Sequence, residues 1–223
     1  MGKSTLVDLL GGLRQADSGT VRYGGVPLED IAPAQLRREI AVIPQEAWVA
    51  PGTLRENLLY LAPEADPRSL AHCIELLGLA PVVAAAGGLD ASLTQRSQSL
   101  SAGERQLIAL ARVYLSPARV VLLDEATSSL DAEAEARVEE AFADRADTTL
   151  VIVAHRLSSA ARADRIVLLD GDRPLVGTHE ALLDASPLYA ELARHWSGPA
   201  SGPRPPIITP WERLGSRTGT TLS

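Results

Sequence analysis

The stretch QSLSAGERQLIALARVYLSPARVVLLDEATSSLD, residues 98–131, decides the expected fold. Its first part places Ser101 three residues before Glu104 and ahead of a run with helical apolar spacing, which is the capping-box pattern that opens a helix. Its second part contains VVLL at 120–123, a continuous apolar run typical of a parallel strand buried on both faces. A helix followed by a buried parallel strand indicates an α/β protein.

Two carboxylates, Asp124 and Glu125, follow the predicted strand directly. Ligands of open parallel sheets bind beyond the carboxyl ends of the strands, and successive side chains point to different sides. One carboxylate can therefore face a metal ion through its water shell while the other polarises an attacking water. Adjacent carboxylates also occur as simple helix caps, and Asp131 is expected to cap the acidic helix that follows it.

The N-terminal residues Gly2, Lys3, Ser4 and Thr5 read GKST and lead into an apolar helical pattern. They match the second half of the phosphate-binding loop G-x-x-x-x-G-K-[ST], where backbone N–H groups hold phosphates, lysine adds charge and a hydroxyl binds Mg²⁺. GKST alone is a weak signal. The first glycine of the loop does not precede it, so we expect Met1 to be internal to a longer loop, the N-terminal strands to be missing, and ATP binding by the 223-residue form to be weak or absent.

Two more apolar runs end on a single polar residue. AVIPQ ends at Gln45 and TTLVIVAH ends at His155. A lone glutamine at a strand end is usually a turn residue, and a lone histidine is usually structural. Because the carboxyl ends of parallel strands meet at one edge of a sheet, both side chains can also join the two carboxylates.

The order and spacing of these segments resemble the nucleotide-binding domain of ATP-binding cassette (ABC) transporters. GTLRENLLYL (52–61), AHRLSSA (154–160) and GTHEALL (177–183) are similar to elements of the exporter-type members. The resemblance covers residues 2 to about 195. It implies a P-loop NTPase-like, mostly parallel sheet flanked by helices, with an inserted helical subdomain at about 54–116 that carries the signature loop.

The resemblance also implies that the chain binds ATP and Mg²⁺. Glu125 and His155 are the implied catalytic residues, and Ser4, Gln45 and Asp124 are the implied metal ligands. The remaining implied ATP contacts are Gly2, Lys3, Thr5, Ser101, Gly103, Glu104 and Asp131.

The signature loop reads LSAGE where the family usually has LSGGQ. Ala102 replaces a glycine, which is tolerable only if its φ is negative, and Glu104 replaces a glutamine. Ser101 and Gly103, which in the family lie nearest the phosphate, are kept, so we expect a working loop.

The implied partners are a second nucleotide-binding domain, identical or different, and the transmembrane domain of an exporter. In the family the signature loop of one domain closes over the nucleotide held by the other. Trp48 and Val49 are expected where the membrane domain docks, although Ala50 stands where exporters usually carry a large apolar residue. The chain is therefore expected in the cytoplasm, at the inner face of the cell membrane.

The composition agrees with one folded domain, expected at residues 1–196. The chain has 223 residues, 46% of them hydrophobic, and a net charge of -7, which disfavours nucleic acid as a partner. No apolar run approaches the roughly 20 residues that cross a bilayer. The single cysteine, Cys73, excludes an internal disulfide and is expected to be a buried packing residue. Residues 197–223 are rich in Pro, Gly, Ser and Thr and are expected to be a disordered tail.

Two alternatives to an exporter ATPase remain open at this point. A soluble ABC ATPase acting on ribosomes or DNA would show tandem cassettes, coiled-coil arms or a basic face, and none is visible. The second alternative is a catalytically impaired fragment that lacks the full P-loop. Folded domains are stable by only about 5–15 kcal/mol, so the loss of a central strand weighs against independent folding.

Overall fold

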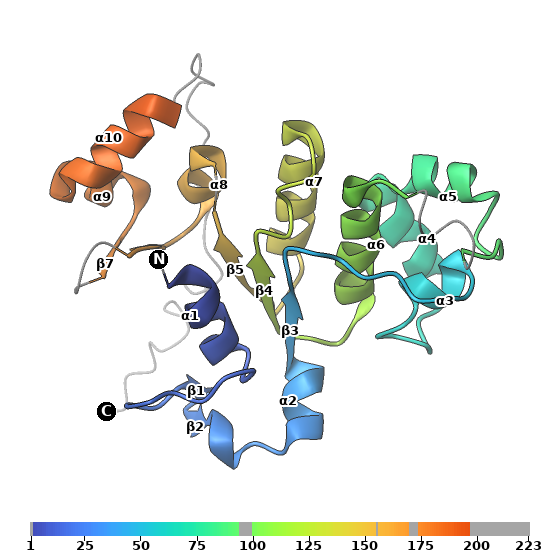
Figure 1. Cartoon of the computed structure of the whole chain (residues 1–223), viewed down its shortest axis with the longest axis horizontal. Helices are drawn as coiled ribbons and strands as arrows, with labels where there is room; N and C mark the ends of the chain where they lie inside the picture. Colours follow the sequence, from blue (N-terminus) through green and yellow to red (C-terminus); the bar gives the residue numbers. More distant parts are fainter. Residues whose placement is uncertain (1, 94–99, 155, 170–173, 197–223) are drawn as a thin grey trace, which may run out of the picture.

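A parallel three-stranded sheet forms the centre of the chain (Figure 1). The computed structural model describes residues 2–93, 100–154, 156–169 and 174–196. The sheet has the order β3-β4-β5, with strands β3 (Ile40–Ile43), β4 (Val120–Asp124) and β5 (Thr149–Val153). Its central strand is the one predicted from VVLL, and the predicted α/β class is confirmed.

Helices flank this sheet and two short hairpins lie outside it. Before β3 come α1 (Lys3–Leu10), β1 (Arg22–Tyr23), β2 (Val26–Pro27), the 3₁₀ turn η1 (Leu28–Asp30) and α2 (Pro33–Glu39). Between β3 and β4 come α3 (Leu54–Leu58), α4 (Pro67–Leu76), α5 (Ala80–Ala86) and α6 (Ala102–Leu115). The rest are α7 (Ala132–Ala143), α8 (Leu157–Arg162), β6 (Ile166–Leu168), β7 (Leu175–Gly177), α9 (His179–Ala185) and α10 (Pro187–Trp196).

The side chains of β4 alternate between two hydrophobic clusters on opposite faces of the sheet. Val121 and Leu123 join the larger cluster, whose other members come largely from α3 to α7. Leu122 joins a smaller cluster with Val7 of α1. Because strand side chains alternate, Asp124 falls on the same face as Leu122. The carboxylate of Asp124 therefore lies on the face of the sheet that α1 covers.

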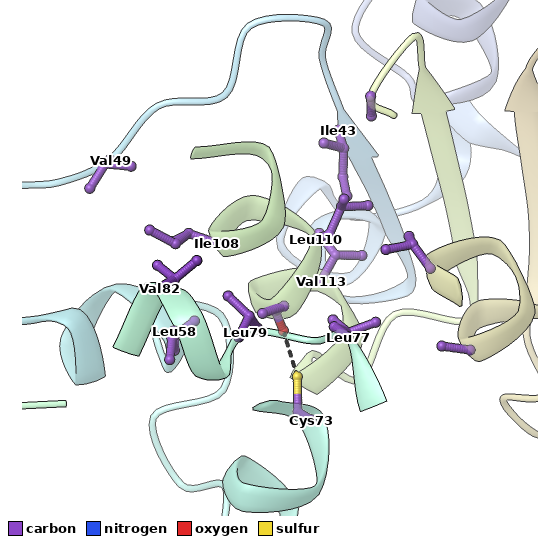
Figure 2. Packing of buried hydrophobic residues seen from close by; sticks show 14 of the residues in the cluster. Ile43, Val49, Leu58, Cys73, Leu77, Leu79, Val82, Ile108, Leu110 and Val113 are labelled. Atoms are coloured by element: carbon purple, nitrogen blue, oxygen red, sulfur yellow. Dashed lines mark hydrogen bonds between the residues drawn. The ribbon is translucent and has the colours of Figure 1, made fainter. Parts of the chain in front are cut away.

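The larger cluster holds the helical part together (Figure 2). Cys73 of α4 is fully buried there, and its Sγ lies 3.9 Å from the carbonyl oxygen of Ala111 in α6. Burial raises the pKa of the Cys73 thiol to about 12, so it remains protonated at neutral pH. The prediction of a buried packing cysteine is confirmed. Gly87, at φ +87°, ends α5.

Three observations remain: the length of the helices, the range of the helical subdomain and the limits of the described residues. None of the described helices alone is long and apolar enough to cross a membrane; α4 and α5 pass by length and composition only as a pair bent by 109°. The helices α3 to α6 span Leu54–Leu115, the range expected for the helical subdomain, whose limits as a domain stay a prediction. His155 and the expected tail 197–223 lie outside the described residues.

Candidate functional site

The carboxyl ends of the three parallel strands bring the predicted site segments to one edge of the sheet. Ile43 of β3 pairs with Leu123 of β4, so Gln45 follows β3 at the level where Glu125 follows β4. Asp124 pairs with Val153, the last residue of β5. The strand register thus collects Gln45, Asp124 and Glu125 as the sequence predicts.

Asp124 carries a buried oxygen atom at the end of β4. Its Oδ1 is shielded from solvent and makes no hydrogen bond within the part of the chain that the structure describes. Burying a carboxylate oxygen unpaired is costly, so such an atom calls for an explanation such as an ion or water. The atom lies at the ligand edge of the sheet, on the face that α1 covers.

The start of α1 lies on the same face of the sheet and presents its own donors. Gly2 has φ +103°, and the N–H of Leu6 donates to its carbonyl oxygen at 2.9 Å as the first turn closes. The amides of Lys3, Ser4 and Thr5 come before that bond, and all three residues are exposed. First-turn amides at the positive end of a helix dipole favour an anion.

The backbone turns sharply at Glu125. This residue has φ +56°, a left-handed conformation that costs about 1–2 kcal/mol for a residue with a Cβ. The carbonyl of Glu125 accepts from the N–H of Ser128 at 3.0 Å, which closes the turn. Strained residues of this kind cluster at functional sites. The chain thus leaves the direction of β4 directly after Asp124.

The predicted capping box at the start of α6 is confirmed. The Ser101 Oγ accepts from the N–H of Glu104 at 3.1 Å, and the Glu104 Oε2 accepts from the N–H of Ser101 at 2.7 Å. Ala102 is the first helical residue and is not among the described residues with positive φ, as the loop requires. The Ser101 hydroxyl keeps its own proton, so it and the amides of Ala102 and Gly103 remain suited to an anion.

A second loop packs against this helix start. A Cβ added at Gly103 would lie 2.9 Å from the carbonyl oxygen of Ser129, so only glycine fits without movement. The same loop ends at Asp131, whose Oδ1 accepts from the amides of Glu133 and Ala134 at 3.0 and 2.8 Å. The predicted cap of α7 at Asp131 is confirmed.

Oxygen atoms are the donors that the predicted metal residues offer. The Ser4 hydroxyl, the Gln45 amide oxygen and the Asp124 carboxylate suit Mg²⁺, which usually takes one or two protein ligands together with waters and phosphate oxygens. The described residues contain no group of three or more His, Cys, Asp or Glu side chains able to hold a metal. A magnesium ion brought in with a nucleotide therefore fits better than a cage made by the protein alone.

Buried polar residues on the helices were missed by sequence reasoning. Gln106 and Arg112 of α6 are 2% and 7% exposed, and Glu135 of α7 is 5% exposed. Glu135 pairs with Arg156 at 3.0 Å and accepts from the Thr127 hydroxyl at 3.1 Å. One signal was present: each of the three stands on the apolar side of its helix, where a polar residue needs a partner.

Arg112 supports an exposed aromatic pair. Its Nε donates to the Asn57 carbonyl at 2.7 Å, its Nη1 donates to the Trp48 carbonyl at 2.6 Å, and its Nη2 donates to the Asn57 Oδ1. Trp48 and Tyr60 are both 61% exposed, and their rings meet edge-to-face with centroids 6.4 Å apart. Val49, by contrast, is 8% exposed and belongs to the larger cluster, so the expectation that it lies on the docking surface is wrong. It alternates inward beside Trp48, and Tyr60 is the exposed neighbour.

The chain is similar to known proteins over most of its length. The family model described as "ABC transporter" matches residues 1–128. The ABC transporter ATP-binding protein RamB of Streptomyces coelicolor is 50% identical over 197 residues, which are 88% of this chain and 32% of that protein. The mycobactin import ATP-binding/permease protein IrtB of Mycolicibacterium smegmatis is 40% identical over 86% of this chain and 34% of its own length.

A solved structure gives the same result. A bacterial Atm1-family ABC exporter with ATP bound has a TM-score of 0.80 and 30% sequence identity, covering 88% of this chain and 35% of that one. The chain thus spans about a third of the length of the relatives that it matches. These relatives favour neither the soluble ABC ATPase nor the impaired fragment. The parallel sheet, the residues gathered at its edge and these similarities together show that the chain belongs to the ABC transporter family, as a nucleotide-binding domain.

Proposed function

We propose that this domain binds Mg-ATP and hydrolyses it to drive substrate movement through the transmembrane domain of an exporter. The observation that carries the proposal is the pair of carboxylates at the end of β4. Asp124, on the face that α1 covers, has a buried oxygen that is unpaired among the described residues, and Glu125 follows it with a left-handed backbone. Phosphoryl transfer requires positioning and charge neutralisation, which such an arrangement supplies.

The nucleotide's phosphates are bound at the start of α1. Gly2 and the amides after it contact the phosphate oxygens, and the Lys3 ammonium neutralises their charge. Thr5 adds a further contact from the first turn. Ser4, Gln45 and Asp124 hold the Mg²⁺ that arrives with the nucleotide and that neutralises charge on the β- and γ-phosphates.

Glu125 orients the attacking water and accepts its proton. The water oxygen forms a bond to the γ-phosphorus while the bond to the β–γ bridging oxygen breaks, so that inorganic phosphate forms and ADP leaves on the side opposite the attack. His155 donates a hydrogen bond to a γ-phosphate oxygen. A positioned general base contributes about 10²–10⁴-fold to a rate, so the roles of these two residues are testable by substitution.

A second nucleotide-binding domain, identical or different, completes the site. The Ser101 hydroxyl and the Gly103 amide bind the γ-phosphate held by the partner, and Glu104 keeps the loop in shape through the capping box. Asp131 acts at the same interface while capping α7. Binding of two ATP molecules draws the domains together, and hydrolysis releases them.

The transmembrane domain docks on the surface formed by Trp48 and Tyr60. These rings are exposed and edge-to-face, and aromatic residues of this kind are enriched at protein interfaces. The domain consists of residues 1–196, with a helical part at about 54–116, and acts in the cytoplasm at the inner face of the membrane. Nucleic acid is not a partner.

The decisive test replaces Glu125 by glutamine. The wild-type chain and the Glu125→Gln variant are each fused behind the residues that precede the matched segment in the Streptomyces relative, giving what we call the fused form. We expect the substitution to reduce phosphate release by at least about 100-fold while the Kd for Mg-ATP, measured by equilibrium dialysis, changes by no more than a few-fold. Glu64→Gln, the same change at an exposed carboxylate, serves as control. Equal turnover in the wild-type and Glu125→Gln forms contradicts the proposal.

A further inference from the structure

Gln106 joins two segments of the site that are far apart in the sequence. It belongs to α6 and is 2% exposed. Its Nε2 donates to the carbonyl oxygen of Gln45 at 3.0 Å, and its Oε1 accepts from the N–H of Ser129 at 3.1 Å. Gln45 follows β3 and Ser129 follows β4, so one side chain bridges the loops after both strands.

The bridge requires a carboxamide. The carbonyl of Gln45 only accepts and the amide of Ser129 only donates, which fixes the orientation of the Gln106 side chain without ambiguity. Glutamate at this position keeps the acceptor and loses the donor. Methionine fills a similar volume and loses both.

The Ser129–Leu130 backbone is held from other directions as well. The carbonyl of Ser129 packs on Gly103, where no Cβ fits. The carbonyl of Leu130 accepts from the Arg156 Nη2 at 3.3 Å. This backbone therefore has little freedom to move unless Gln106 and the start of α6 move with it.

We propose that Gln106 is a positioning residue that couples the loop of Gln45 to the loop of Ser129. The inference rests on the proposed function, in which Gln45 contacts the domain's own Mg-ATP while Ser101 and Gly103 contact the partner's. When bound nucleotide shifts Gln45, the Gln45 carbonyl moves the Gln106 side chain that is hydrogen-bonded to it. Gln106 in turn moves the Ser129 amide and α6. In a dimer, a change at one nucleotide site thereby alters the other site through one side chain.

The first test needs no nucleotide. Amide hydrogen exchange at Ser129 is measured in the full chain for the wild type, Gln106→Met and Gln106→Glu. We expect exchange at Ser129 to rise roughly tenfold in Gln106→Met and to stay within about twofold in Gln106→Glu, which keeps the acceptor. Ile108→Val on the same helix, a buried change that leaves the bridge intact, controls for a general loss of stability. Unchanged Ser129 exchange in Gln106→Met overturns the bridge.

The second test measures coupling in the fused form. We expect Mg-ATP to slow Ser129 exchange in the wild type, and Gln106→Met and Gln106→Glu to bind Mg-ATP with a Kd within about threefold of the wild type. In both variants we expect Mg-ATP no longer to slow exchange at Ser129 and kcat to fall at least about tenfold. Ile108→Val should keep the nucleotide response and the kcat of the wild type. A nucleotide response that persists in either variant overturns the coupling while leaving the proposed function intact. Failure of the wild-type fused form to bind Mg-ATP overturns the proposed function, and the coupling with it.

Discussion

Arg112 offers the sharpest test of how the helical part is held together. Arg112 is 7% exposed, and its guanidinium donates three hydrogen bonds, two to Asn57 and one to the Trp48 carbonyl. Asn57 is itself 1% exposed, and its Nδ2 donates to the carbonyls of Ala50 and Thr53 at 3.0 and 2.9 Å. The perturbation is Arg112→Met, which keeps the length of the aliphatic stem and removes every donor.

The magnitude follows from the bonds that are lost. Hydrogen bonds to charged groups each contribute about 1.5–3 kcal/mol net, and the two Asn57 acceptors left behind are buried. Part of that loss is returned, because burial of the guanidinium is unfavourable; the same desolvation lowers the pKa of Arg112. We expect Arg112→Met to lower the free energy of unfolding by about 3 kcal/mol. Arg112→Lys keeps the charge but not the planar fork and should cost less, about 2 kcal/mol.

Equilibrium urea unfolding followed by circular dichroism at 222 nm measures both changes. Arg55→Met is the matched control, because Arg55 forms an ion pair with Asp90 at 2.7 Å in which the Arg55 side chain is 40% exposed and the Asp90 side chain 77%. It makes the same chemical change and should have little effect. A loss below about 1 kcal/mol for Arg112→Met, or one equal to that of the control, refutes the reasoning.

Three other outcomes are expected. Because burial raises the Cys73 pKa from 9.0 to about 12, iodoacetamide at pH 8 should label the thiol only through unfolding, and stability should fall as pH rises above about 9; rapid labelling of the native chain contradicts this. Asp131→Ala should cost about 1 kcal/mol in urea unfolding and Asp131→Asn much less, whereas equal losses argue against the cap. Gly103→Ala should lower both stability and ATP turnover of the fused form, because its Cβ meets the Ser129 carbonyl at 2.9 Å. A gain of about 1 kcal/mol in the free energy of unfolding, the usual difference between alanine and glycine inside a helix, means that the Ser129 loop moves aside without cost and contradicts this prediction.

Features that depend on neighbouring residues were predictable from the sequence. The β4 strand, the Ser101–Glu104 capping box and the Asp131 cap each follow from a local pattern, and the structure contains all three. The gathering of Gln45 beside the two carboxylates followed from the geometry of parallel strands. Each of these inferences needed only a few consecutive residues and a general rule of secondary structure.

The contacts that join distant segments were not predictable in the same way. Gln106 is 61 residues from Gln45 along the chain, and Arg112 is 64 residues from Trp48. Periodicity shows that such residues face inward but not which carbonyl they meet. Val49 was misjudged for a related reason, since it is buried in a cluster whose other members come largely from α3 to α7.

The left-handed backbone at Glu125 has a consequence for how variants of this domain respond to selection. Asparagine and glycine adopt such a conformation more readily than glutamate, so replacing Glu125 by either relieves strain at the same position that supplies the carboxylate. Screening a library for thermal tolerance alone would enrich these replacements and remove the acidic group. At residue 125, therefore, substitutions that raise thermal stability remove the carboxylate that the proposed hydrolysis requires.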